Sequence, residues 1–220
     1  MNNQNIVFFR HSILIWFKNN GREYPWRNEI DSYKILIAEM MLQRTRADQV
    51  VPVYIEFIKK FPTILSLAEA DIDDIILYLI NLGLPRRANR MKEAARMIVM
   101  KHDSVIPSER MELLKIPGIG EYIADAVITL AYDGHRIAID SNVERIVTRF
   151  FGMAIKREIR RNKQFSNFCQ TFTNRLKPQS VKNLNWAMID HAALICKPKP
   201  ICQKCSLIEN CIYTKKTTIS

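Results

Sequence analysis

Four cysteines gather within the last 25 residues in the pattern C-x5-C-x2-C-x5-C. They are Cys196, Cys202, Cys205 and Cys211. In a chain that reads as intracellular, this spacing indicates metal ligation rather than disulfide bonds. Four thiolates so close together can bind either one Zn²⁺ or an iron–sulfur cluster. Structural zinc sites more often use two C-x2-C pairs, and only one is present, so the spacing favours a [4Fe–4S] cluster over Zn²⁺. The fifth cysteine, Cys169, stands among apolar residues at helical spacing and is predicted to lie in the core.

Two acidic residues have unusual surroundings. Glu39, in YKILIAEMMLQRT, falls on the apolar side of a predicted helix. A buried carboxylate there could be protonated and act as a proton donor, or it could be a core acid paired with an arginine. Asp140, in HRIAIDSNVERIVTRFFG, lies between an apolar stretch and an apolar-periodic helix. The residues alone therefore favour a helix N-cap at Asp140.

A glycine-containing turn separates two predicted helices in LLKIPGIGEYIADA, residues 113–126. One helix ends near Lys115, the segment from Pro117 to Gly120 forms a hairpin, and the next helix opens at Glu121. Glycines let backbone amides approach an anion closely, and a helix N-terminus adds partial positive charge. The pattern suits a DNA phosphate contact that reads no sequence, although an ordinary turn between helices would look similar.

The elements that must position these residues are predicted to be helices throughout. The chain has only six glycines, and apolar residues recur every three or four positions in long segments. Breaks are expected at residues 61–63, 83–85 and 133–134, and a further helix is expected to start at Pro107-Ser108. The predicted fold class is all-α.

Composition and charge narrow the class of protein. With 220 residues, 48% hydrophobic and 25% charged, the chain is an ordinary globular protein. It has no apolar stretch long enough to span a membrane and no secretory cleavage pattern, so it is predicted to be intracellular. The net charge is +11; residues 1–134 hold 17 basic and 17 acidic residues, whereas residues 135–220 hold 16 and 5. This asymmetry favours a nucleic-acid-binding face, built mainly by the C-terminal third, over a charge that serves only solubility. The basic group Lys156, Arg157, Arg160 and Arg161 is weaker evidence by itself, since charge runs are usually solvated faces.

Taken together, the motifs resemble the helix–hairpin–helix DNA glycosylases of the endonuclease III superfamily. The resemblance runs from about Arg22 to Cys211 and rests on REYPWR, AEMMLQRT, NLGLPRRA, PGIGEY, IDSN and the terminal cysteines. The first cysteine gap is one residue shorter than is usual in the family.

The resemblance implies two helical domains with DNA bound in a groove between them. Residues 26–134 would form a six-helix barrel containing the hairpin, and residues 1–25 and 135–220 an iron–sulfur cluster domain. The implied partner is double-stranded DNA with a mismatched or damaged base. A monomer with no membrane association, in the cytoplasm at the nucleoid, is expected.

The implied reaction is hydrolysis of an N-glycosidic bond after the nucleotide flips out of the duplex. Asp140 matches the aspartate that stabilises the oxocarbenium-like sugar and guides water, a role compatible with helix capping. Enzymes of the family that also cut the strand have a lysine where this chain has Tyr122. We therefore predict a monofunctional glycosylase.

The excised base is harder to predict. Glu39 matches the glutamate that protonates adenine in MutY-type enzymes, yet Arg44 and Leu84 match mismatch-specific thymine glycosylases, and Trp186 replaces the residue that reads adenine. Adenine enzymes also usually carry a C-terminal domain, whereas this sequence stops nine residues after Cys211. We predict thymine or uracil opposite guanine, with adenine as the alternative.

The resemblance assigns the remaining site residues. Predicted DNA contacts are Gln43, Arg44, Leu84, Gly118, Ile119 and Gly120; predicted base-pocket residues are Arg22, Trp26, Leu42, Asn142 and Trp186; predicted catalytic residues are Asp140, Glu39 and Tyr122. Trp26 could equally be a core anchor. A non-enzymatic DNA-binding module with a structural cluster is the rival class, since it would share the basic face, hairpin and cysteines.

Overall fold

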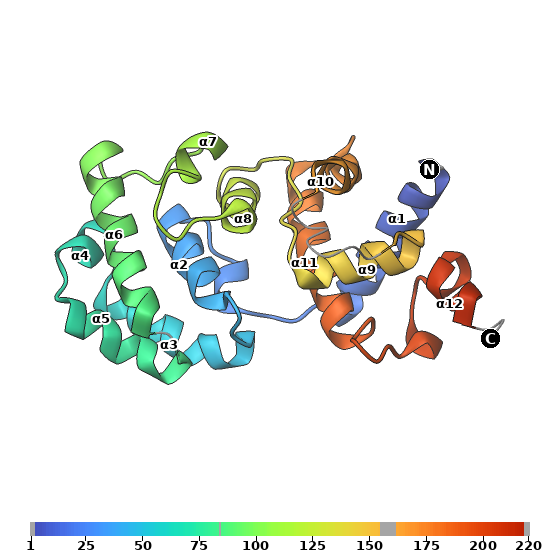
Figure 1. Ribbon diagram of the computed structural model, residues 1–220, viewed down its shortest axis with the longest axis horizontal. Helices are drawn as coiled ribbons and strands as arrows, with labels where there is room; N and C mark the ends of the chain where they lie inside the picture. The colour runs from blue at the N-terminus through green and yellow to red at the C-terminus, as the bar shows by residue number, and fades with distance from the viewer. Residues whose placement is uncertain (1–2, 84, 155–161, 218–220) are drawn as a thin grey trace. The chain divides into compact units, whose positions relative to one another are not determined.

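The computed structural model describes residues 3–83, 85–154 and 162–217, and within these ranges all regular secondary structure is helical (Figure 1). This confirms the all-α prediction. The α-helices are α1 (Asn3–Asn20), α2 (Ser32–Leu42), α3 (Ala47–Lys60), α4 (Ile64–Glu69), α5 (Ile72–Leu79), α6 (Pro85–Lys101), α7 (Arg110–Leu113), α8 (Glu121–Ala131), α9 (Ser141–Phe151), α10 (Lys163–Gln170), α11 (Pro178–Leu194) and α12 (Ile212–Thr217). No helix in the described part of the chain has the length and hydropathy needed to cross a membrane.

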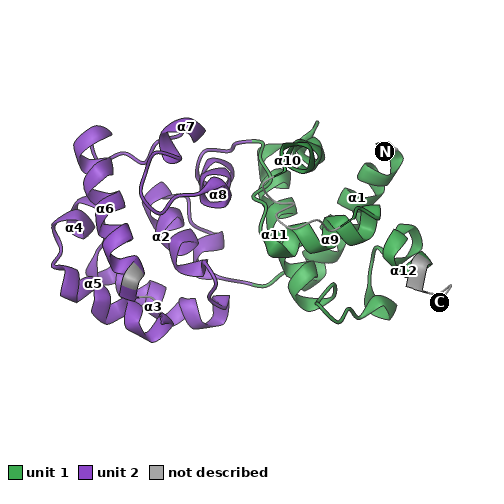
Figure 2. Ribbon diagram, in the orientation of Figure 1, with its two compact units in different colours: residues 1–22, 135–220 green, residues 23–134 purple. Residues whose placement is uncertain are grey.

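The chain divides into two compact units (Figure 2). Unit 2 is the contiguous segment 23–134, which contains α2 to α8. Unit 1 combines residues 1–22 with residues 135–220, so that α1 shares a core with α9 to α12. Unit 2 contains Glu39, Tyr122 and the hairpin, whereas unit 1 contains Asp140 and the four clustered cysteines.

In unit 2, α2 packs against α3 and α8, while α4 and α5 pack against α6. The sequence pattern predicts one apolar side on the helix that holds Glu39, but α2 is enclosed much more completely. Tyr33 and every residue from Ile35 to Met41 are buried. Because neighbouring helices cover most of its surface, α2 is the central helix of this unit rather than an amphipathic surface helix.

Helix boundaries in unit 2 follow local chemistry. Thr63 begins α4 with a reciprocal capping box to Ser66, which explains the predicted break after Phe61. Gly83 takes a left-handed φ of 68° just before α6. The helix expected from Pro107-Ser108 begins later, at Arg110, because Glu109 is the extended residue that precedes it.

In unit 1, α1 packs along α11, and α9 packs against both α11 and α12. The core is rich in aromatic rings: Phe9 lies 5.1 Å from Phe150 and 5.4 Å from Phe172, measured between ring centroids. Cys169 is fully buried in the same core, as predicted. Gly152 ends α9 at a φ of 66°, and a Cβ there would come within 2.5 Å of Ile212, so glycine allows α12 to pack closely.

Candidate functional site

Asp140 is the N-cap of α9, which confirms the capping prediction. Its Oδ1 accepts hydrogen bonds from the backbone N–H groups of Asn142 and Val143, both at 2.8 Å. Its Oδ2 accepts a third, from Nδ2 of Asn142 at 2.6 Å. Three N–H donors at a helix N-terminus therefore fix the orientation of this carboxylate.

A chain of hydrogen bonds continues from Asn142 towards the cysteines. Arg145 donates from Nη2 to Oδ1 of Asn142 at 2.8 Å and from Nε to the carbonyl oxygen of Cys196 at 2.7 Å. The same Nη2 also donates to the carbonyl oxygen of Ala192 at 2.9 Å. Asp140 is thus linked through two side chains to the backbone of the first cysteine.

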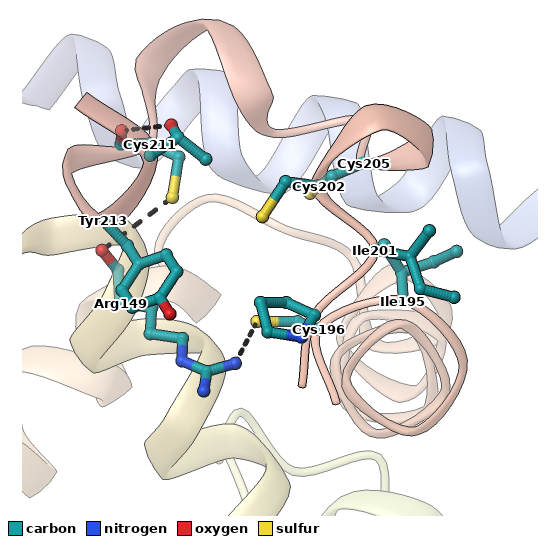
Figure 3. Close-up of a pocket in the computed structure, with 10 residues that line it drawn as sticks. Arg149, Ile195, Cys196, Ile201, Cys202, Cys205, Cys211 and Tyr213 are labelled. Atoms are coloured by element: carbon teal, nitrogen blue, oxygen red, sulfur yellow. Dashed lines mark hydrogen bonds between the residues drawn. The ribbon is translucent and has the colours of Figure 1, made fainter. Parts of the chain in front are cut away.

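The four clustered cysteines line one pocket of unit 1 (Figure 3). Helix α11 ends just before Cys196, while Cys202, Cys205 and Cys211 follow on short 3-10 turns and the start of α12. Within the described residues, no three His, Cys, Asp or Glu side chains lie close enough together to hold a single metal ion. What the four cysteines share is the lining of this one pocket.

Two nitrogen-bearing side chains contact these sulfur atoms. Arg149 lies at the pocket wall with its Nη1 3.6 Å from Sγ of Cys196, and it holds the following loop by donating to the carbonyl oxygens of Lys197 and Pro198. The Nε2 of His191 lies 3.8 Å from Sγ of Cys205. Burial lowers the pKa of His191 to about 4, so its imidazole is neutral near pH 7.

The cysteine thiols share a poorly solvated environment. Burial raises the pKa of Cys205 to about 11. Burial also raises the pKa of Cys202, and the charges of Cys211 and Cys196 act in the same direction. Four neighbouring thiolates repel one another unless a positive group balances them, as happens in a metal site.

The hairpin of unit 2 contacts the end of α2. Gly118 has a φ of 82°, and a Cβ there would lie 3.2 Å from Cε of Met40. The side chain of Gln43 donates from Nε2 to the carbonyl oxygen of Gly118 at 3.4 Å. Two predicted DNA contacts, Gln43 and Gly118, are therefore brought together.

The other hairpin residues differ in exposure: Ile119 is buried, whereas Gly120 is exposed. The Ile119 side chain is buried and its N–H donates to the carbonyl oxygen of Ile116 at 3.1 Å, so Ile119 anchors the turn. Gly120 is exposed and caps α8, whose first N–H groups have no partner within the helix. Arg110 forms an ion pair with buried Asp125 at 2.8 Å, which braces α7 against α8.

Glu39 and Tyr122 belong to the two helices that form the centre of unit 2. Glu39 is only 5% exposed on α2, as the sequence predicts. Tyr122 is partly buried in the first turn of α8, directly after the hairpin, and α2 packs against α8. This helix pair therefore carries a buried carboxyl group and a phenol.

The predicted base-pocket residues occupy varied environments. Trp26 is buried and stacks on Tyr24 at 5.0 Å, so it serves as a core anchor of unit 2. Leu42 and Trp186 are partly buried. Arg22 forms an ion pair with fully buried Asp190, with Nη2 2.7 Å from Oδ1.

Some predicted residues lie outside the described part of the chain: Leu84, Lys156, Arg157, Arg160 and Arg161. Conversely, sequence reasoning missed the roles of Arg145 and Arg149. Their spacing gave a usable signal, because residues three and four apart share one face of a helix, and Asn142, Arg145 and Arg149 follow that spacing along α9.

Comparison with known proteins defines the class. Residues 37–171 match the family described as HhH-GPD superfamily base excision DNA repair protein. The chain therefore belongs to this family of DNA glycosylases, and the resemblance inferred from its motifs is confirmed.

Similar proteins include both thymine/uracil-DNA glycosylases and adenine DNA glycosylases. The thymine/uracil-DNA glycosylase of Pyrobaculum aerophilum is 31% identical over 213 residues, which cover 94% of this chain and 92% of the relative. The adenine DNA glycosylase of Buchnera aphidicola subsp. Baizongia pistaciae is 32% identical over 94% of this chain, which spans only 58% of that relative. The solved structure of a thermostable thymine-DNA glycosylase matches with a TM-score of 0.90 and 29% identity, over 97% of this chain and 98% of the other.

Proposed function

We propose that this glycosylase binds duplex DNA and hydrolyses the N-glycosidic bond of thymine or uracil mispaired with guanine. The observation that carries the hydrolytic role is the geometry of Asp140, whose carboxylate three N–H donors orient at the N-terminus of α9. In the reaction, the bond from the sugar C1′ to the base breaks and water forms a new bond to C1′. Asp140 would stabilise the positive charge that develops on the sugar and guide this water.

Tyr122 supports a monofunctional reaction. A strand-cutting glycosylase needs an amine that attacks the sugar and forms a Schiff base, and a phenol has none. The product would be an abasic site in an uncut strand.

The preference for thymine or uracil rests on Trp186 and on the named relatives. An indole has one N–H donor and no acceptor for the exocyclic amine of adenine. The relatives named thymine/uracil-DNA glycosylase and the matching thymine-DNA glycosylase structure support the same choice. A mispaired base also costs less to unstack than a paired one.

A second candidate is adenine opposite guanine or 8-oxoguanine. Buried Glu39 favours it, because a carboxyl group with little exposure could protonate a leaving adenine. In the thymine reaction, Glu39 would orient the base or water instead.

A base-release assay separates these candidates. Labelled duplexes with G·T, G·U, A·G and A·8-oxoguanine pairs would be incubated with the protein and treated with alkali to reveal abasic sites. Release confined to thymine and uracil supports the proposal. Release of adenine would replace it with the second candidate, and activity on none of the four would contradict both.

We infer that Cys196, Cys202, Cys205 and Cys211 ligate a [4Fe–4S] cluster. The four sulfur atoms line one pocket, and their spacing contains a single C-x2-C pair flanked by two wider gaps. A cube with four separate iron corners fits such an arrangement better than one tetrahedral Zn²⁺. When bound, the cluster would supply four metal–sulfur bonds that hold residues 196–211 together. Metal analysis of the purified protein distinguishes iron from zinc, and stoichiometric zinc without iron would contradict this inference.

A further inference from the structure

Unit 2 has few positive charges to attract DNA. Residues 23–134 contain 14 Lys and Arg but 17 Asp and Glu, a net charge of −3. A phosphate contact in such a unit requires a local concentration of positive charge, because the overall field does not favour a polyanion. Arg44, Arg87 and Arg90 provide that concentration beside the hairpin.

Arg87 fixes the position of this group relative to α2. It lies in the first turns of α6, and its Nη1 is 3.3 Å from the carbonyl oxygen of Met40 and 3.5 Å from that of Met41. These carbonyls belong to the last turn of α2, where the helix dipole favours a cation. Arg44 follows two residues after the end of α2, with an exposed side chain and a left-handed φ of 58°.

Arg90 lies against the hairpin itself. A Cβ built on Gly118 would be 3.4 Å from Cβ and 3.9 Å from Cδ of Arg90, so the aliphatic part of this side chain passes the glycine. Gln43 reaches the same residue through its hydrogen bond to the Gly118 carbonyl oxygen. The hairpin turn, the end of α2 and the start of α6 thus form one continuous surface that bears three guanidinium groups.

The three charges lack an internal counterion. Burial lowers the pKa of Arg87, and the positive charges of Arg44 and Arg90 lower it further. Across the described ranges, no ion pair joins a carboxylate to any of these three arginines. Like charges held together without a counterion repel one another, and a bound anion relieves that repulsion.

We propose that Arg44, Arg87 and Arg90 form a phosphate-binding patch for the backbone of duplex DNA, continuous with the hairpin at Gly118 and Gly120. The proposal deepens the proposed function, on which it rests, by assigning two residues of α6 to the DNA interface. Arg87 anchors the patch to α2, while exposed Arg44 and Arg90 neutralise neighbouring phosphates. Because phosphates carry no sequence information, the patch contributes affinity and register rather than base choice.

The test compares Arg44→Gln and Arg90→Gln with Arg96→Gln, a matched change at an exposed arginine of α6. Binding of a short duplex, with and without a G·T pair, would be measured over a range of salt concentrations. Each patch variant should bind both duplexes more weakly and reduce the slope of log affinity against log salt by about 1. Arg96→Gln should behave as the wild type, and melting temperatures would verify that all variants fold.

Two results would overturn the patch. One is a salt slope for Arg90→Gln and Arg44→Gln equal to that of Arg96→Gln. The other is a loss of affinity confined to the mismatched duplex, which would indicate base recognition instead. The proposed function can fail independently of the patch. If the wild-type protein binds duplex DNA but releases no base, the proposed function is contradicted, while the salt slopes still decide whether the patch exists.

Discussion

The side-chain amide of Asn142 donates to Oδ2 of Asp140 across 2.6 Å, inside the first turn of the helix that Asp140 caps. The amide oxygen of Asn142, Oδ1, accepts a hydrogen bond from Nη2 of Arg145. The amide of Asn142 is therefore held in one orientation, since turning it over would place its N–H groups against those of Arg145. This constraint makes the carboxylate sensitive to a change at Arg145, which acts on it through Asn142.

Asp140→Asn tests the carboxylate directly. Asparagine is as good an N-cap as aspartate, so the helix should persist. The new amide, however, cannot carry the negative charge that stabilises the sugar cation, and base release should fall by at least about 10²-fold. Single-turnover base release and binding of a mismatched duplex would both be measured. Binding should stay within a few-fold of wild type; full activity would refute the assignment of Asp140.

Arg145→Lys tests the link between Asp140 and the cysteine pocket. A lysine cannot reproduce the fork that contacts Asn142 and the Cys196 carbonyl oxygen together. At least one of these partly buried acceptors would lose its donor, at a cost of about 1–3 kcal/mol in the free energy of unfolding. We expect a slower single-turnover rate with unchanged duplex affinity. A variant whose melting temperature and rate both match wild type would show that the link has no effect.

Tyr122→Lys tests the monofunctional prediction. The wild type should form no covalent adduct with DNA under borohydride, because its phenol cannot make a Schiff base. Lysine at the start of α8 introduces the missing amine, so this variant should be trapped on DNA. Denaturing gels report the adduct, and Tyr122→Phe serves as a control that removes only the hydroxyl. An adduct with the wild type would contradict the prediction.

Cys202→Ser tests metal ligation, with Cys169→Ala as its matched control. Cys202 lines the pocket of four cysteines, whereas Cys169 is buried in the core of unit 1. Loss of one ligand should reduce the iron content and make residues 196–211 more sensitive to protease. Cys169→Ala should keep its iron. Equal iron content in the two variants would rule out Cys202 as a ligand.

Cys169 also predicts a dependence of stability on alkaline pH. Burial raises the pKa of its thiol from 9.0 to about 12. Above pH 9 the unfolded chain loses this proton while the folded chain keeps it, so stability falls as the pH rises towards 12. The full difference amounts to about 4 kcal/mol. Urea unfolding between pH 8 and about 10.5 should show a smaller decline for Cys169→Ala than for wild type; parallel declines would contradict this reasoning.

Much of the fold could be predicted because local signals decide it. Asp140 combines a capping side chain with an apolar-periodic helix, and Glu121 follows a glycine turn, so both helix starts are confirmed. The burial of Glu39 also followed from its apolar neighbours. The helix expected from Ser108 began two residues later because the extended conformation of Glu109 decided its start.

The side-chain links could be predicted only in part, because they depend on segments far apart in the sequence. Arg145 and Cys196 are separated by 51 residues, and nothing in either segment alone reveals their hydrogen bond. The spacing of Asn142 and Arg145 could have indicated a shared helix face, but not what that face contacts. The same limit applies to Arg90, whose packing against Gly118 depends on how α6 lies beside the hairpin.

The discontinuity of unit 1 has a consequence for synthesis of the chain. Unit 2 is one uninterrupted segment and can fold as soon as residues 23–134 have left the ribosome. Helix α1 must wait for its partner α11, so its apolar residues Phe9 and Ile13 stay uncovered until residues 178–194 have been made. Helix α1 is thus made before unit 2 but completes its packing after it, and its apolar residues are open to contacts with other chains throughout that interval.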